Sequence, residues 1–189
     1  MIGVLNYKII LMGDPNVGKT TLRNSFMGER ISGKYEKTIG VEISEKKIQI
    51  RPDLYARLLI YDIAGQKQFE YLHDLFFAGS HGALAVFDVT NVESFRRTIL
   101  WVLRYWRVLN CYRPVILIAN KIDLEESRVI SRENIEQLAL KFSEKCSCEV
   151  PFYETSALNG INVEKSFYRL IKMIIEESNN IEIEYRLET

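Results

Sequence analysis

The sequence has few cysteines, no long hydrophobic run and no excess of charge of either sign. With 25 Lys and Arg against 25 Asp and Glu, its formal net charge is zero. It therefore lacks the overall basic bias that is typical of proteins binding nucleic acid or anionic membranes. No window is long and apolar enough for a membrane span, and the N-terminus lacks a signal-peptide pattern, so we expect a cytoplasmic protein.

Cysteine is scarce as well. The three cysteines are Cys111, Cys146 and Cys148, and an odd number in a chain of this length does not indicate a disulfide framework. Cys146 and Cys148 are separated by one residue, whereas a zinc knuckle needs a gap of two, and no histidine lies near them. We therefore expect reduced thiols.

The 189 residues suffice for one domain with a sizeable core, which we place at residues 1–177, followed by an acidic tail at 178–189. Within this domain, near-continuous apolar runs alternate with helical patterns, as in a sheet covered by helices on both faces. The strand-like runs are 4–12, 58–63, 83–89 and 115–119, and the expected helices are 19–27, 92–109, 131–146 and 162–177. Residues 43–57 contain the turn former Arg51-Pro52-Asp53, which the apolar segments 48–50 and 58–60 flank. This pattern indicates an antiparallel hairpin at one sheet edge. The pattern predicts a doubly wound α/β fold that binds ligands beyond the carboxyl ends of its strands.

The first such end carries Gly13-Asp14-Pro15-Asn16-Val17-Gly18-Lys19-Thr20, which fits the phosphate-binding loop G-x-x-x-x-G-K-[ST]. Its glycines let backbone N–H groups face one point, and the following helix adds its positive end. Lys19 would reach the β- and γ-phosphates of a nucleotide, and the Thr20 hydroxyl would bind magnesium. The alternative is a glycine-rich turn with a solvated lysine, but a strand before and a helix after favour phosphate binding.

Two further strand ends carry polar motifs. In Asn120-Lys121-Ile122-Asp123 the carboxylate can accept the N1 and amino hydrogens of guanine, a donor pair that adenine lacks. In Asp62-Ile63-Ala64-Gly65-Gln66, Asp62 can hold magnesium through water, Gly65 can approach a γ-phosphate, and Gln66 can orient an attacking water. Taken alone, the first motif is more often a surface loop, and the second is a turn with a solvated glutamine. The phosphate loop about a hundred residues upstream favours guanine binding for the first.

Together with Thr38 and Glu154-Thr155-Ser156-Ala157, these motifs occur in the order seen in Ras-like small GTPases, and the resemblance covers about residues 5–177. The chain looks most like the Rab branch, since 38–42 reads TIGVE, 76–90 resembles "YYRGAHGA…YDVT", and 162–167 resembles "NVEQSF". The resemblance implies a G domain of the P-loop NTPase class. Such a domain has a six-stranded, mostly parallel sheet with one antiparallel edge strand and about five helices.

The resemblance also implies site residues, cofactors and two switch segments at about 29–42 and 62–80. The implied contacts with GTP or GDP are Asp14, Pro15, Asn16, Val17, Gly18, Lys19, Thr20, Thr21, Tyr35, Thr38, Gly65, Asn120, Lys121, Asp123, Ser156, Ala157 and Leu158. The implied Mg²⁺ ligands are Thr20, Thr38 and, through water, Asp62. The residues implied in hydrolysis are Gln66, Lys19, Thr38 and Gly65.

The sequence departs from the family pattern at its end and in the phosphate loop. The tail has no cysteine for prenylation and Ile2 is not the glycine needed for myristoylation, so no membrane anchor is visible, unless a lipidated tail has been removed. The alternation of Ile181, Ile183, Tyr185 and Leu187 fits either an added strand or a frayed tail. Pro15 replaces a glycine of the phosphate loop with a residue that donates no backbone hydrogen bond.

The sequence supports two functions, which differ in whether the phosphate loop with Pro15 allows GTP hydrolysis. The first is a slow GTP-hydrolysing switch that works with an exchange factor, a GTPase-activating protein and an effector. Its effector would contact Ile39, Val41 and Trp101, although a helix tryptophan is more often a core residue. The second is a nucleotide-dependent scaffold in which Pro15 prevents hydrolysis. An ATPase or phosphotransferase would leave the 120–123 motif unexplained.

Overall fold

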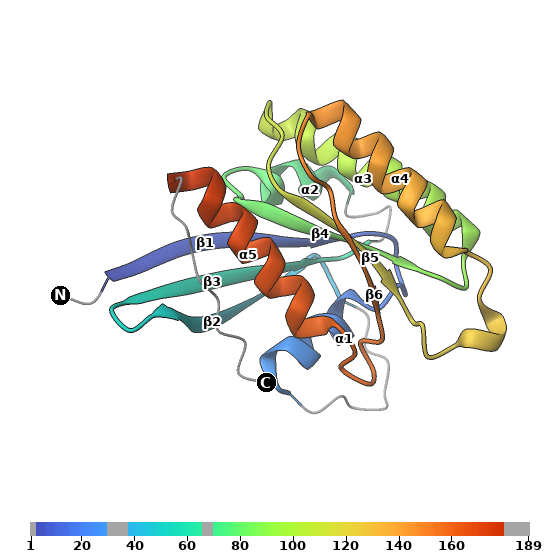
Figure 1. The fold of residues 1–189 in the computed structure, drawn as a ribbon, viewed down its shortest axis with the longest axis horizontal. Coiled ribbons are helices and arrows are strands. Elements are labelled where there is room, and N and C mark those ends of the chain that lie inside the picture. The colour runs from blue at the N-terminus through green and yellow to red at the C-terminus, as the bar shows by residue number, and fades with distance from the viewer. Residues whose placement is uncertain (1–2, 30–37, 66–69, 180–189) are drawn as a thin grey trace.

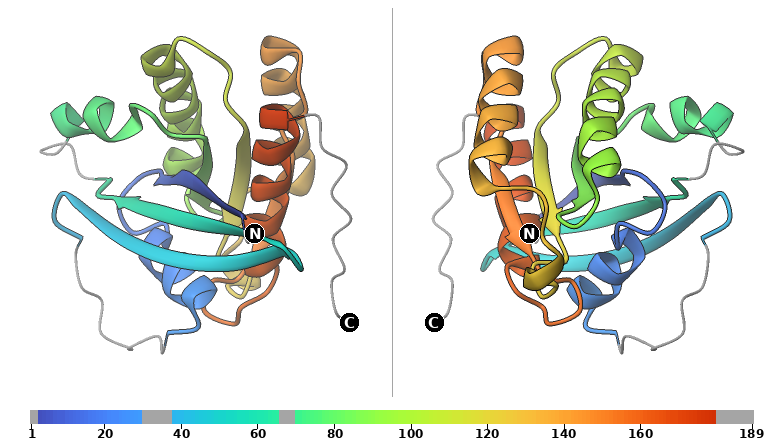
Figure 2. Two further views of the ribbon diagram at one scale, coloured as in Figure 1. Left: turned by 90° about the vertical axis from the view of Figure 1, so that its left-hand side faces the viewer. Right: turned by 90° about the vertical axis from the view of Figure 1, so that its right-hand side faces the viewer.

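The computed structural model describes residues 3–29, 38–65 and 70–179, which form one six-stranded sheet with helices on both faces (Figures 1 and 2). The strands are β1 (Gly3–Met12), β2 (Val41–Arg51), β3 (Leu54–Ile63), β4 (Gly82–Asp88), β5 (Val115–Asn120) and β6 (Phe152–Thr155). The helices are α1 (Lys19–Met27), α2 (Glu70–Phe77), α3 (Val92–Leu109), α4 (Arg132–Cys146) and α5 (Val163–Asn179).

The sheet has the order β2-β3-β1-β4-β5-β6, and only the β2–β3 pairing is antiparallel among its strands. This confirms the predicted sheet with one antiparallel edge strand and helices on its two faces. A short turn at residues 52–53 joins β2 to β3, as the turn former at that place predicts.

Alternating side chains of the inner strands supply two separate cores. In β1, Ile9 and Leu11 pack toward α1 and α5, whereas Ile10 and Met12 pack toward α2, α3 and α4. This follows from the period of two residues in a strand, and it explains why strands covered on both faces are apolar throughout. Figure 2 shows α5 and α3 on opposite sides of the sheet.

The ends of several elements differ from those predicted. The strand β6 did not stand out as an apolar run, because it has four residues at the sheet edge and only Thr155 is fully buried. The helix α5 runs to Asn179, two residues beyond the predicted 177. Ser131 caps α4 as predicted, since its side chain accepts a hydrogen bond from the Asn134 N–H at 3.3 Å. The predicted tail strand lies outside the described residues.

None of the helices within residues 3–29, 38–65 and 70–179 is both long and apolar enough to cross a membrane.

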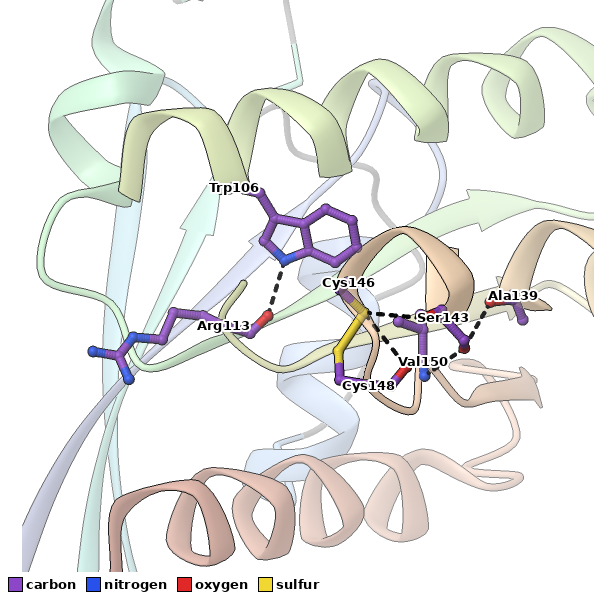
Figure 3. Close-up of a disulfide and its surroundings, with 7 residues drawn as sticks. All are labelled: Trp106, Arg113, Ala139, Ser143, Cys146, Cys148 and Val150. Carbon is purple, nitrogen blue, oxygen red and sulfur yellow. Dashed lines mark hydrogen bonds between the residues drawn. A yellow bond between two sulfur atoms is a disulfide. The ribbon is translucent and has the colours of Figure 1, made fainter. Parts of the chain in front are cut away.

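The prediction of three reduced thiols is wrong in this structure, which joins Cys146 to Cys148 in a disulfide (Figure 3). The reason is a local turn that the cysteine count cannot reveal. Ser147 ends α4 in the left-handed conformation, with φ of 52°, and this reversal brings the flanking Cα atoms to 5.2 Å. That separation falls within the range of protein disulfides. Cys111 is the exposed free cysteine.

A thiol titration tests this pairing. In the native chain without reductant, a water-soluble thiol reagent is expected to find one reactive thiol, that of exposed Cys111. After reduction the count should rise to three, because Cys148 is exposed and Cys146, the last residue of α4, is only partly buried. A count of three before reduction would contradict the disulfide, and a Cys111→Ser variant, expected to give none, serves as the control.

Candidate functional site

Four polar segments meet at the carboxyl ends of the parallel strands, where β1, β3, β5 and β6 end together. Asn120, the last residue of β5, connects three of them. Its Nδ2 donates to the Val17 carbonyl at 2.8 Å, and its Oδ1 accepts from Thr155 Oγ1 and from the Ala157 N–H, both at 3.0 Å. Because Asn120 is only 1% exposed, these bonds fix the loop after β1 against the loops after β5 and β6.

The phosphate loop depends on glycine at its two ends. Gly13 has φ of 142°, and a Cβ there would lie 2.1 Å from the carbonyl oxygen of Val86 in β4. Gly18 has φ of 95°, and a Cβ there would lie 2.3 Å from Asn120 Nδ2. Both backbone conformations disfavour other residues, so the two glycines of the motif bring the loop directly against β4 and β5.

Lys19 begins α1 and points back over the loop. Its Nζ donates to the carbonyl oxygens of Gly13 at 2.9 Å and Asp14 at 2.7 Å. Burial lowers the pKa of Lys19 to about 8, although the carboxylates of Asp62 and Asp14 favour its charged form. A buried ammonium of this kind gains from a bound polyphosphate, which would supply the opposite charge.

Oxygen atoms from three segments converge next to Lys19. Thr20 Oγ1 donates to Asp62 Oδ2 at 2.5 Å and lies 2.9 Å from Thr38 Oγ1. Asp62 is fully buried, and burial raises the pKa of its carboxyl, an effect that the Thr20 hydrogen bond only partly offsets. Among the described residues, Asp62 Oδ1 has no hydrogen-bond partner. A buried carboxylate beside two hydroxyls fits a hard cation such as Mg²⁺.

Gly65 touches the phosphate loop directly. A Cβ on this residue would lie 2.4 Å from the carbonyl oxygen of Gly13 and 2.5 Å from the Pro15 nitrogen. The start of the second predicted switch segment therefore packs backbone to backbone on the loop. Here only a glycine allows the close approach that the sequence motif predicts.

The predicted guanine subsite also assembles. Asp123 Oδ1 accepts from Ser156 Oγ at 2.5 Å, which orients the carboxylate that would receive the base. Lys121, with φ of 70°, forms an ion pair with Asp88 Oδ2 at 2.6 Å. Burial alone would raise the pKa of Asp88, but hydrogen bonds from Lys121 and Thr90 outweigh burial and lower it.

Asp88 was missed in the sequence, although it ends β4 and pairs in register with Asn120. Further charged residues form ion pairs next to the site. Arg23 of α1 forms an ion pair with Glu42 at 2.7 Å, without hydrogen-bond alignment. Glu154, which the sequence motif included without a role, forms ion pairs with Arg128 and with Arg132. It comes directly before Thr155 and Ser156 in the chain. Only the three-dimensional structure shows that these charged residues form ion pairs.

Trp101 was expected on the surface read by an effector, and that expectation is wrong. Trp101 is only 6% exposed, and its Nε1 donates to Asp14 Oδ1 at 2.9 Å. Ile39, by contrast, is 78% exposed and Val41 is partly buried, so the other two residues of that expectation are accessible.

The remaining predicted contacts are less enclosed. Pro15, Asn16 and Leu158 are exposed, and Thr21 is half-buried near the start of α1. Tyr35 and Gln66 lie outside the described residues, so their predicted roles stay predictions.

The lowered pKa of Lys19 predicts that nucleotide affinity depends on pH. In the free protein Lys19 loses its proton near pH 8, whereas phosphates favour the charged amine, so binding above this pH must take up a proton. The GDP affinity is expected to fall about tenfold from about pH 7 to about pH 9. Calorimetry in buffers of different ionisation enthalpy measures the uptake. Guanosine, which lacks phosphates, should show no such uptake, and an equal uptake for both ligands would contradict the assignment to Lys19.

Comparison with known proteins agrees with this geometry. The model of the Ras family matches residues 8–176. The chain is 31% identical over 176 residues to the Ypt/Rab-type GTPase YPT7 of Saccharomyces cerevisiae, covering 90% of this chain and 82% of the relative. It is 33% identical over 184 residues to the Ras-related protein Rab7 of Pisum sativum, covering 93% and 85%. It is 32% identical over 179 residues to the Ras-related protein Rab-27A of Homo sapiens, covering 89% and 78%. The chain therefore belongs to the Ras family, as a guanine-nucleotide-binding small GTPase of the Rab branch.

Proposed function

We propose that this GTPase is a magnesium-dependent switch that hydrolyses GTP to GDP slowly by itself. The observation that carries the proposal is the cluster of Lys19, Thr20, Thr38 and Asp62. Within this cluster, Thr20 Oγ1 lies 2.9 Å from Thr38 Oγ1 in the segment 29–42 and 2.5 Å from Asp62 Oδ2 in the segment 62–80. Thr20 therefore joins the phosphate loop to both predicted switch segments. A ligand that holds these residues together would order both segments, and its loss would release them.

Each residue has a defined task in this proposal. Thr20, Thr38 and, through water, Asp62 would hold Mg²⁺, which neutralises phosphate charge when it is bound. Lys19 would stabilise charge on the β- and γ-phosphates, and the Gly65 N–H would donate to the γ-phosphate. Gln66 would orient the attacking water.

Partners would control the rate. The sequence has no arginine in residues 13–20 or directly beside Thr38, so intrinsic hydrolysis should be slow. A GTPase-activating protein that supplies an arginine could accelerate it by about 10³–10⁵-fold. An exchange factor would promote GDP release, and an effector would read exposed Ile39 and the neighbouring Val41.

A second candidate function rests on Pro15. This residue cannot donate a backbone hydrogen bond, and its nitrogen lies where Gly65 packs on the loop. A scaffold that binds GTP but does not hydrolyse it would follow if Pro15 keeps the second segment out of the hydrolytic arrangement.

Single-turnover hydrolysis of GTP and of ATP, with magnesium, distinguishes these functions. For the switch we expect slow cleavage of GTP but not of ATP, and its loss in Gln66→Leu. Tight GTP binding without cleavage, unchanged by this substitution, would favour the scaffold. In that case Pro15→Gly should bring hydrolysis back.

A further inference from the structure

The phosphate loop contains a carboxylate, which is the wrong charge beside a bound polyphosphate. Asp14 is 7% exposed, and its Oδ1 accepts from Trp101 Nε1 at 2.9 Å and lies 3.3 Å from Arg97 Nε. Both partners lie on α3, one turn apart. They direct the carboxylate toward α3, and Arg97 supplies the compensating charge that makes this position tolerable.

The contact continues from α3 to α2. The His73 ring lies 4.6 Å from the ring of Trp101, and His73 is 2% exposed. His73 Nε2 lies 3.0 Å from the carbonyl oxygen of Ala64. The next residue, Gly65, packs on the backbone of Asp14. The contacts therefore form a closed ring through the phosphate loop, α3, α2 and the segment after β3.

We propose that Trp101 is a positioning residue that couples α2 to the phosphate loop. We name the chain of contacts Asp14–Trp101–His73 the bridge. The inference rests on the proposed switch function, in which the segment 62–80 changes with the bound nucleotide.

The physical reason for the coupling is the burial of both ends of the bridge. A shift of α2 displaces the His73 ring from the face of Trp101. If the indole followed that shift and left Asp14, its buried N–H would lose its acceptor and Asp14 would keep only Arg97 as a partner, which is an expensive outcome. The loop and α2 therefore move together. A partner that pulls α2 away would loosen the phosphate site and speed nucleotide release, without touching the nucleotide itself.

The chain supplies its own matched control for a test. Helix α3 carries two buried tryptophans, and Trp106 donates its indole N–H to the Arg113 carbonyl at 2.9 Å, away from the phosphate loop. Trp101→Phe and Trp106→Phe remove the same donor and keep an aromatic ring. In the GDP-bound full chain we expect GDP release to accelerate about tenfold or more in Trp101→Phe. Release from Trp106→Phe should stay within about twofold of the wild type.

A double-mutant cycle tests the path of the coupling. His73→Phe keeps a ring against Trp101 but removes the contact with Ala64, so it should also speed release. If both residues act in one chain of contacts, the double variant should release GDP no faster than the faster single variant. Multiplied effects would overturn the bridge, because they would mean that the two residues act independently.

A spectroscopic measurement keeps the inference falsifiable if Trp101→Phe does not fold. The chain has two tryptophans, so Trp106→Phe leaves Trp101 as the sole indole. Its fluorescence is expected to change when GDP is exchanged for a non-hydrolysable GTP analogue, because His73 would shift on its ring. Unchanged fluorescence, or equal release rates in the two tryptophan variants, would overturn the bridge while leaving the GTPase function intact. A chain that binds no guanine nucleotide would instead refute the proposed function.

Discussion

Replacing Asp123 by asparagine is expected to lower the affinity for GDP and GTP by about 10²–10⁴-fold. The variant would lose the two charge-assisted hydrogen bonds that the Asp123 carboxylate can accept from guanine, each contributing about 1.5–3 kcal/mol. The local fold should survive, since the Asn oxygen can still accept from Ser156 Oγ, the partner that Asp123 has at 2.5 Å. Equilibrium binding of a fluorescent GDP analogue measures the loss.

The same variant should change base preference rather than simply lose affinity. Xanthine carries a carbonyl in place of the exocyclic amino group of guanine, and the Asn amide can donate to that carbonyl. We therefore expect Asp123→Asn to bind xanthosine diphosphate better than GDP, and ADP no better than the wild type does. Equal affinity of variant and wild type for GDP would show that Asp123 does not read the base.

Replacing Gly65 by alanine is expected to reduce GTP hydrolysis by about 10²-fold or more while GDP remains bound. The added methyl would lie 2.4 Å from the Gly13 carbonyl oxygen and 2.5 Å from the Pro15 nitrogen, both backbone atoms of the phosphate loop. Either the loop or the segment after β3 must move away, and a misplacement of about 1 Å near reacting groups costs about 10²-fold in rate. Single-turnover hydrolysis and GDP affinity, measured together, separate the two effects.

Gly79→Ala is the control for this substitution. Gly79 has φ of 69° and has open space where its Cβ would lie, so alanine there strains the backbone without meeting the loop. We expect a modest loss of stability and unchanged hydrolysis. Similar hydrolysis by wild type and Gly65→Ala would mean that the segment after β3 does not need its close packing on the loop.

The parts of the site that the sequence predicts are those in which a short segment fixes its own geometry. Gly13, Gly18 and Lys19 could be identified because glycine allows the backbone turn and lysine follows at a fixed spacing. Asp62 and Asn120 could be identified because each lies at the carboxyl end of an apolar strand, and parallel strands end at one edge. These local features sufficed for the fold class and for the segments that meet at the site.

The errors and omissions have physical causes of two kinds. Cys146 and Cys148 were predicted to be reduced thiols because the chain has an odd number of cysteines. The distance between the two Cα atoms depends instead on the left-handed turn at Ser147. Trp101 was assigned to the surface that an effector would contact. The helical pattern of the sequence does not show that a polar acceptor, Asp14 Oδ1, lies beneath the helix. Asp14 lies 87 residues away from Trp101 in the chain.

The sequence by itself determined the alternation of strands and helices, the phosphate loop, the guanine motif and the resemblance to small GTPases. Each of these depends on residues that are neighbours along the chain or on the common edge where parallel strands end. Tertiary structure alone decided that Asn120 joins three loops, that Asp88 holds Lys121, and that Trp101 and His73 connect α2 to Asp14. These contacts unite residues far apart in sequence, and their energies come from burial and hydrogen-bond geometry that exist only once the helices pack on the sheet.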